Sequence, residues 1–450
     1  MYNVTINKKS VSKNIFWLFI DKILRAGLTL LINLLMARHF GKNSFGVWSY
    51  SLSFVMFVSI LSSSGIKEIV IRDLALAVNP KIKNFILGSA FVIRNFMYLL
   101  FSIALIFLIK FLHPNNAVIL QITFFLLLAN SFQFSEIFDF DFQSKLQSKY
   151  TVYGRNSAFI IVSLIRIYCI FIDSTLITFT FLVIVEMFLA ALIMLLFYQK
   201  DGSVLHWRYN KKIATKMIWD GLPLLVSGVG VLLYMRIDQV MIGELIGIDS
   251  VGSYAAIVNI SEVAHAIPLI IGVSLQPWLI KARQENYIIY REYLQIIFEI
   301  MVRLGILWAI FMTLFGGLLV RIFLGNAYVE ATNALLIHSW SYVFIFSGYI
   351  ATRWLIIEGF LRLIFWNSLI AASTSILLNI ILIPKLGIIG CSISTIFSQA
   401  IASYFIYYIF KESREIFLMQ TEVFIKLFSP SKNIALWKKI KIEGLSILSN

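Results

Sequence analysis

Long apolar runs dominate this chain, and each is long enough to cross a lipid bilayer as a helix. A bilayer core about 30 Å thick needs roughly 20 residues of helix. Charged residues, Pro or Gly clusters separate the runs, which we place at 14–37, 45–65, 85–111, 117–138, 152–172, 175–198, 214–235, 251–276, 294–324, 331–357, 361–383 and 388–410. The pattern predicts an all-α polytopic membrane protein with twelve transmembrane helices.

The composition agrees with a membrane protein. Hydrophobic residues make up 60% of the chain and charged residues 14%, with a mean hydropathy of +0.86. A soluble domain has about 45–50% apolar and about 25% charged residues. With the N-terminus inside, 25 of the 38 Lys and Arg residues fall on the inner side and 6 on the outer side. The positive-inside rule therefore predicts that both termini are cytoplasmic, and the scattered basic residues argue against nucleic-acid binding.

A short motif occurs twice in the chain. Residues 41–48 and 247–254 share the pattern Gly-x-[Asn/Asp]-Ser-[Phe/Val]-Gly-x-[Trp/Tyr] at an offset of 206, with a weaker echo at Gly387. Gly permits a tight turn there, and Ser can cap the following helix. Six spans separate the two copies, so we expect a parallel internal repeat of two six-helix bundles. The predicted parts are a cytoplasmic N-terminus 1–13, bundles 14–198 and 214–410, a cytoplasmic linker 199–213, and an amphipathic cytoplasmic tail 411–450 that lies at the membrane interface.

Seven basic residues lie inside the predicted spans. A charge at the middle of a bilayer costs about 2.5–3.5 kcal/mol, so such residues must face a water-filled cavity or one another. Arg94, Arg166 and Arg353 have no acidic residue nearby on their own helix, which indicates a cationic cavity. Arginine suits a diphosphate because its fork offers paired donors and keeps its charge. The predicted binding set is Lys22, Arg25, Arg94, Arg155, Arg166, Arg303 and Arg353.

Some of these charges also have a structural interpretation. Arg25 and Arg303 each follow an acidic residue by four positions, Asp21 and Glu299 respectively, and such pairs can neutralise each other. Lys22 can extend toward the cytoplasmic interface. The sequence leaves both interpretations open for these residues.

Carboxylates that can be protonated inside the membrane are candidates for ion coupling. We select Glu186, Asp238 and Glu262, although Asp238 can instead form a salt bridge to nearby Arg236. The sequence contains no Gly-x4-Gly-Lys phosphate loop, and its five His and two Cys residues show no metal-ligand spacing. We therefore expect no cofactor, and we expect uphill transport to use an H⁺ or Na⁺ gradient.

Three segments carry a family resemblance. Residues 236–243 read Arg-x-Asp-Gln-x-x-Ile-Gly and lead into the second motif copy, while residues 385–390 open the last span. Together with the first motif copy, they resemble the polysaccharide-exporter branch of the multidrug/oligosaccharidyl-lipid/polysaccharide (MOP) superfamily, and most closely the Wzx-type O-antigen repeat-unit flippases. Twelve predicted spans, where the peptidoglycan-precursor flippase branch has fourteen, argue against that branch.

The resemblance implies a MATE-like fold and a role in lipopolysaccharide or other surface polysaccharide biosynthesis. Members of the branch carry undecaprenyl-diphosphate-linked oligosaccharide across the bacterial inner membrane, from the cytoplasmic to the periplasmic leaflet, by alternating access. It also implies a transporter rather than an enzyme, one that can associate with a polysaccharide polymerase and a chain-length regulator.

Two alternatives remain at this point. A cation-coupled multidrug exporter of the same superfamily would need an acidic or apolar cavity, which the arginines inside the spans disfavour. A membrane polymerase or ligase of the same glycan pathway generally needs a large periplasmic loop, and the predicted outer loops are short.

Overall fold

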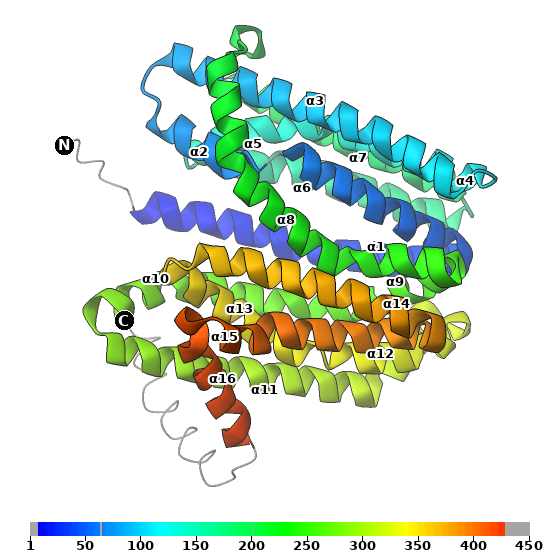
Figure 1. Ribbon diagram of the computed structural model, residues 1–450. Coiled ribbons are helices and arrows are strands. Elements are labelled where there is room, and N and C mark those ends of the chain that lie inside the picture. Colours follow the sequence, from blue (N-terminus) through cyan, green and yellow to red (C-terminus); the bar gives the residue numbers. More distant parts are fainter. Residues whose placement is uncertain (1–7, 64, 201, 428–450) are drawn as a thin grey trace. The chain divides into compact units, whose positions relative to one another are not determined.

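The computed structural model describes residues 8–63, 65–200 and 202–427, and the side chains of residues 8–23, 273, 274, 277 and 361 fall outside this description. Within these ranges every regular element is a helix and no strand occurs (Figure 1). The predicted all-α fold is therefore confirmed.

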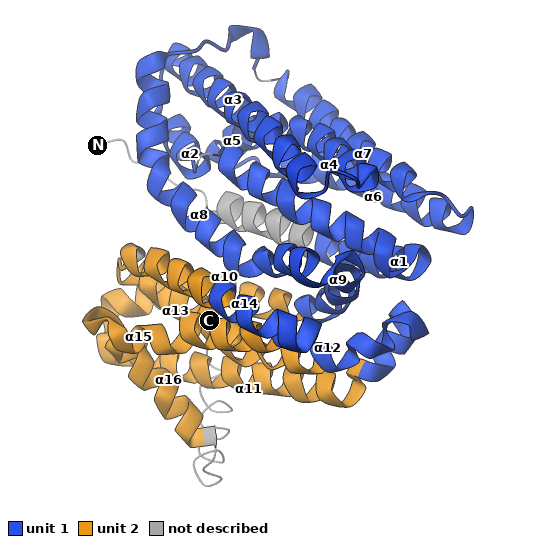
Figure 2. Cartoon of the chain, turned by 45° about the vertical axis from the view of Figure 1, so that its right-hand side comes forward, with its two compact units in different colours: residues 1–263, 317–334, 376–391 blue, residues 264–316, 335–375, 392–450 orange. Residues whose placement is uncertain are grey.

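The chain forms two compact units, coloured separately in Figure 2. The first unit contains the described residues up to Val263 together with Gly317–Ala334 and Ile376–Cys391. The second contains Ala264–Gly316, Leu335–Ser375 and the described residues from Ser392 onward. Helices α8 (Lys211–Ile246) and α9 (Ile248–Glu262), with which the predicted second bundle begins, belong to the first unit. The boundaries of the two bundles stay a prediction.

Nine of the described α-helices lie wholly in the first unit. They are α1 (Lys8–Ser63), α2 (Lys67–Leu76), α3 (Pro80–Leu112), α4 (Ala117–Ser131), α5 (Glu136–Ser144), α6 (Lys149–Phe171), α7 (Leu176–Tyr198), α8 (Lys211–Ile246) and α9 (Ile248–Glu262). The other described α-helices are α10 (Ala266–Glu285), α11 (Tyr287–Leu319), α12 (Thr332–Ser339), α13 (Tyr342–Ile357), α14 (Leu361–Ala400), α15 (Ile406–Ile409) and α16 (Arg414–Leu427). Ile376–Cys391 of α14 belongs to the first unit.

Asparagine side chains start three of the long helices. Asn79 accepts a hydrogen bond from the backbone N–H two residues on, at the start of α3, and Pro80 follows it in the first turn. Asn116 and Asn210 accept from the N–H three residues on, at the starts of α4 and α8. These caps satisfy backbone donors that have no partner within the helix, and so fix where each apolar segment begins.

The duplicated motif forms two turns that pack on each other within the first unit. Gly41 and Gly247 have φ angles of 73° and 99°, which side chains other than glycine rarely adopt, and Gly387 at the weaker echo has a φ of 59°. The equivalent residues Asn43 and Asp249 are joined by a hydrogen bond of 2.5 Å. The two motif copies therefore form similar turns in contact with each other, and the parallel repeat of two six-helix bundles stays a prediction.

The second glycine of each motif copy allows this close packing. A Cβ on Gly46 would collide with the backbone carbonyl of Ile248, and a Cβ on Gly252 would collide with the carbonyl of Lys42. The reciprocal contact explains why this motif needs glycine at two positions: one glycine makes the turn and the other admits the partner backbone.

Among the described residues, nine helices are long and apolar enough to cross a membrane, or ten if the bent pair Asn326–Ser339 and Tyr342–Ile357 is one span. Two of the nine, Leu24–Leu76 and Arg362–Ile409, are interrupted at Gly41 and Gly387. The predicted total of twelve counts each of these two as two spans, and the exact number stays a prediction.

The C-terminal helix α16 packs into the second unit. Ile416, Met419 and Val423 are buried among the core residues of that unit, and Gln295 of α11 donates a hydrogen bond to the carbonyl of Met419. Buried Gln420 donates to the backbone carbonyl of Ser403, in a π-helical turn. The described part of the predicted tail is thus held by protein contacts on one face, while residues 428–450 lie outside the described residues.

Candidate functional site

A half-buried cluster of opposite charges joins α3, α5 and α6 in the first unit. Arg94 Nη1 lies 2.8 Å from Glu136 Oε2, and Arg155 Nη2 lies 3.7 Å from Glu136 Oε1 and 3.7 Å from Asp139 Oδ2. Arg94 also donates to Gln133 Oε1 at 3.3 Å. Glu136 thus lies between two arginines that come from different helices. We name Arg94, Glu136, Asp139 and Arg155 the bridged cluster.

The bridged cluster lies beside a break in the helical path. Helix α4 ends at Ser131, a 3₁₀ turn covers Phe132–Ser135, and α5 begins at Glu136. Neighbouring hydrogen bonds hold the Asp139 carboxylate, which accepts from Thr151 at 2.6 Å and from Gln143 at 2.9 Å. Glu136 is therefore the first residue of a helix, whereas Arg94 and Arg155 lie inside continuous helices.

A second pair, more completely buried, joins α6 and α7. Arg166 Nη2 lies 2.9 Å from Glu186 Oε2, and the two side chains are 10% and 9% exposed. The charge of Arg25 also acts on Glu186. Arg25 donates to Asn156 Oδ1 at 3.1 Å, and its guanidinium lies 5.1 Å from the ring centre of Phe159. Arg25 on α1 is thereby brought to the same region as Arg166.

The prediction that Arg94 and Arg166 are unpaired is wrong. Their carboxylate partners, Glu136 and Glu186, lie on neighbouring helices and not on their own. Arg155 and Arg166 lie on the same helix but do not belong to one site. Eleven residues of helix separate them by about 16 Å along the axis, so they join different clusters.

In the second unit, Arg303 lies 3.7 Å from Glu299 on the same helix, which confirms the i,i+4 pair. Lys426 of α16 approaches the same carboxylate at 3.4 Å. Arg353 of α13 has a different environment, because its Nη1 donates to the neutral amide oxygen of Gln276 on α10 at 3.2 Å. Among the described side chains, no carboxylate lies within 4.0 Å of Arg353.

Aromatic and imidazole rings gather on the same two helices of the second unit. The ring of His265, just before α10, lies 5.1 Å from that of Tyr342 and 6.5 Å from that of Tyr349. Tyr349 is one helical turn before Arg353. Gly272 packs beside the Arg353 side chain, where an added Cβ would lie 3.7 Å from Nε. Arg353 therefore lies beside a neutral amide, one helical turn from a tyrosine whose ring approaches that of His265.

The predicted coupling carboxylates lie in three environments. Asp238 is buried and accepts hydrogen bonds from Tyr254 at 3.2 Å and from Asn379 at 2.9 Å, so it connects α8, α9 and α14. Arg236 makes its ion pair with Glu262, at 3.4 Å. Glu186 is bound to Arg166, as described above.

The last predicted site residue, Lys22, has its side chain outside the described part of the structure. Cys169 and Cys391 are buried, and neither forms a disulfide bond. Within the described ranges, no group of three or more His, Cys, Asp or Glu side chains has the arrangement of a metal site.

One polar cluster was not predicted. Tyr50 on α1 donates a hydrogen bond to Glu244 on α8 and lies 2.8 Å from Nε2 of His113, at the end of α3. His113 Nε2 lies 3.2 Å from the Glu244 carboxylate. These residues are 63 and 194 positions apart from Tyr50 in the sequence, so no local pattern could connect them.

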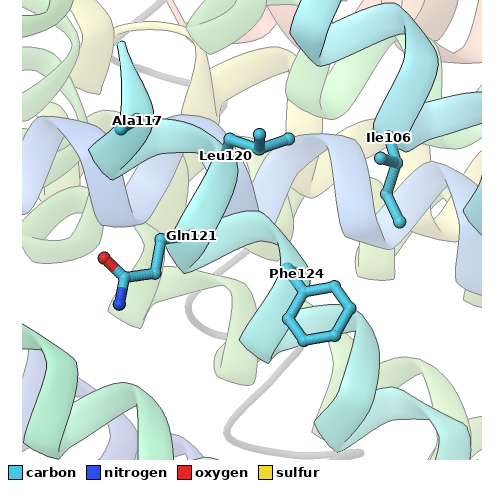
Figure 3. Close-up of a pocket in the computed structure, with 5 residues that line it drawn as sticks. All are labelled: Ile106, Ala117, Leu120, Gln121 and Phe124. Atoms are coloured by element: carbon cyan, nitrogen blue, oxygen red, sulfur yellow. The ribbon is translucent and has the colours of Figure 1, made fainter.

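A pocket of about 430 Å³ lies between α3 and α4 in the first unit (Figure 3). Ile106 of α3 and Ala117, Leu120, Gln121 and Phe124 of α4 line it. None of the predicted site residues lines this pocket. Its apolar wall is typical of a helix surface that faces lipid.

The sequence is similar to a known protein family. The sequence profile of the family described as "Polysaccharide biosynthesis protein" matches residues 11–283, more than half of the chain. No curated protein sequence matches the chain at a significant level.

Solved structures share its fold. The lipid II flippase MurJ, in an inward closed conformation, superposes with a TM-score of 0.67 at 14% identity, covering 91% of each chain. An inward-facing multidrug resistance MATE family transporter of the MOP superfamily gives 0.65 at 12% identity, covering 92% of this chain and 99% of that one. The MATE multidrug transporter DinF-BH gives 0.60 at 14% identity, covering 93% of this chain and 98% of that one. The expected MATE-like membrane-transporter fold is confirmed.

Proposed function

The chain belongs to the polysaccharide biosynthesis protein family and has the fold of a multi-pass membrane transporter, and from this premise we propose that it flips a lipid-linked oligosaccharide. The substrate we infer is a surface-polysaccharide repeat unit, such as O-antigen, on undecaprenyl diphosphate. It moves from the cytoplasmic to the periplasmic leaflet of the bacterial inner membrane, with both termini of the protein cytoplasmic.

Arginines held inside the apolar helices are the observation that supports a diphosphate substrate. Arg353 carries most of this argument, because its neutral partner Gln276 leaves the guanidinium charge uncompensated by any described carboxylate. A guanidinium binds diphosphate oxygens with paired, charge-assisted hydrogen bonds. The nearby rings of His265 and Tyr349 offer flat surfaces of the kind on which sugar rings pack.

The remaining basic residues take part in different ways in this proposal. Arg25 and Arg166 both act on the Glu186 carboxylate, so a substrate anion in their region would meet two guanidinium groups. Arg303 already contacts Glu299 and is the weakest candidate of the set. Arg94 and Arg155 bind the substrate only in competition with Glu136, as we argue below.

Alternating access by the two predicted halves is the mechanism we propose, coupled to H⁺ or Na⁺. Asp238 is the leading coupling residue of the three candidates. It accepts hydrogen bonds from two neutral side chains, which can hold a carboxylate in either its charged or its protonated form. Glu186 and Glu262 instead each contact an arginine.

A deletion strain tests this function against the alternatives. Flipping predicts that lipid-linked repeat units accumulate on the cytoplasmic face while surface glycan disappears. Loss of repeat-unit synthesis would overturn the proposal. Unchanged glycan together with greater sensitivity to cationic drugs would favour the multidrug exporter. We place the protein beside a polysaccharide polymerase and a chain-length regulator, which use the flipped units.

A further inference from the structure

We propose that Glu136 is an internal competitor of the substrate: its carboxylate occupies the position between Arg94 and Arg155 that the substrate's diphosphate takes when it binds. The inference rests on the proposed function, since it assumes an anionic substrate. It assigns Glu136 as a positioning residue that keeps two arginines ordered while the site is empty and leaves when substrate arrives.

The contacts of Glu136 fit those of a bound anion. Its two oxygens face different arginines, Oε2 at 2.8 Å from Arg94 and Oε1 at 3.7 Å from Arg155. The charge of Lys67, at the start of α2, acts on the same carboxylate. Two arginines from two helices therefore contact one carboxylate, as they would a phosphate, and the charge of Lys67 adds to the attraction.

The Glu136 side chain can move away while the other residues of the bridged cluster keep their contacts. Its side chain is 34% exposed, whereas that of Arg94 is 4% exposed. It is the first residue of α5, directly after the 3₁₀ turn. When the Glu136 side chain rotates toward solvent and the backbone stays in place, Arg94 keeps its hydrogen bond to Gln133 and Arg155 keeps its contact with Asp139.

The electrostatic balance also favours exchange. Lys67, Arg94 and Arg155 carry three positive charges, and Glu136 and Asp139 carry two negative ones. Moving Glu136 away leaves its two arginine partners and the charge of Lys67 acting on the vacated position, which favours a diphosphate there. In contrast, Glu186 lies within a regular helix and is almost completely buried with Arg166, so it has no comparable route to solvent.

Binding of inorganic pyrophosphate to the purified full chain in detergent, measured by titration calorimetry, tests this role. E136Q removes the competing charge and keeps the side-chain shape, so we expect about tenfold tighter binding. E244Q is the matched control, because Glu244 is also 34% exposed and its contacts are Tyr50 and His113 instead of arginines. We expect E244Q to bind within about twofold of the unchanged chain.

A second variant keeps the test informative if E136Q fails to fold. E136D retains the charge but withdraws the carboxylate by one methylene, and we expect severalfold tighter pyrophosphate binding. The proposal is overturned if the folded variants bind pyrophosphate no more tightly than the unchanged chain. A purely structural role for Glu136 predicts such weaker or equal binding.

The flipping function is separable from this result. R94A should weaken pyrophosphate binding at least about tenfold if the bridged cluster binds anions at all. Tighter binding by E136Q supports the competitor role even if the unchanged chain flips no lipid-linked oligosaccharide, which would overturn only the proposed function. Unchanged binding in E136Q together with weaker binding in R94A overturns the competitor role and leaves the anion site standing.

Discussion

Arg166 in the first unit and Arg353 in the second are the same residue type within apolar helices, but they have different partners. Arg166 is 2.9 Å from a carboxylate, whereas Arg353 donates to an amide oxygen at 3.2 Å. A buried guanidinium and carboxylate largely cancel each other's charge, and a guanidinium beside an amide keeps its full charge. The number of basic residues in the spans therefore overstates the positive charge available to a substrate, and the partner of each arginine decides its role.

Removal of Arg166 should have the largest effect on stability. R166A leaves the Glu186 carboxylate buried without its partner, which costs about 3–5 kcal/mol. Thermal unfolding in detergent should show a large decrease in Tm. The double variant R166A/E186Q should recover most of it, because the unpaired charge is gone. Equal Tm values for R166A and the double variant would contradict this account of the pair.

Removal of Arg353 should instead affect transport and leave the fold intact. R353A loses paired contacts to the substrate, and we expect about a hundredfold less surface glycan in a complementation assay. Its Tm should stay close to that of the unchanged chain because its partner is neutral. R353K should rescue transport in part, since lysine keeps the charge but not the fork. A normal amount of surface glycan in R353A would show that Arg353 does not bind the substrate.

Q276E would give Arg353 a carboxylate partner like that of Arg166. The new carboxylate would contact Arg353 and compete with the substrate, so we expect about a tenfold slower flipping rate with no loss of stability. Q276N, which keeps a neutral amide, is the matched control and should retain most of the rate. Full activity in Q276E would show that Arg353 can function beside a carboxylate. It would contradict the conclusion that the partner of each arginine decides its role.

Local sequence patterns predicted the features that depend on one helix at a time. Apolar run length predicted the membrane-spanning helices, the motif predicted the turns at Gly41 and Gly247, and i,i+4 spacing predicted the Glu299 and Arg303 pair. In each case the residues concerned are neighbours along the chain, or equivalent positions of a repeat, so periodicity alone contains the information.

Contacts between helices could not be predicted in the same way. The partners of Arg94 and Arg166, the cluster of Tyr50, His113 and Glu244, and the packing of α16 depend on how each helix is rotated about its axis and shifted along it. A single sequence fixes neither quantity. An arginine that lacks a partner on its own helix is therefore not evidence of a free charge, since the bilayer favours any cross-helix carboxylate within reach.

Flipping by the purified chain in proteoliposomes most directly tests whether arginine recognition of a diphosphate underlies transport. The same oligosaccharide is presented on undecaprenyl diphosphate and on undecaprenyl monophosphate, with the unchanged chain and with R353A. We expect the unchanged chain to move the diphosphate-linked form at least about tenfold faster, and R353A to lose that preference. Equal rates for the two lipids with the unchanged chain would contradict the central claim.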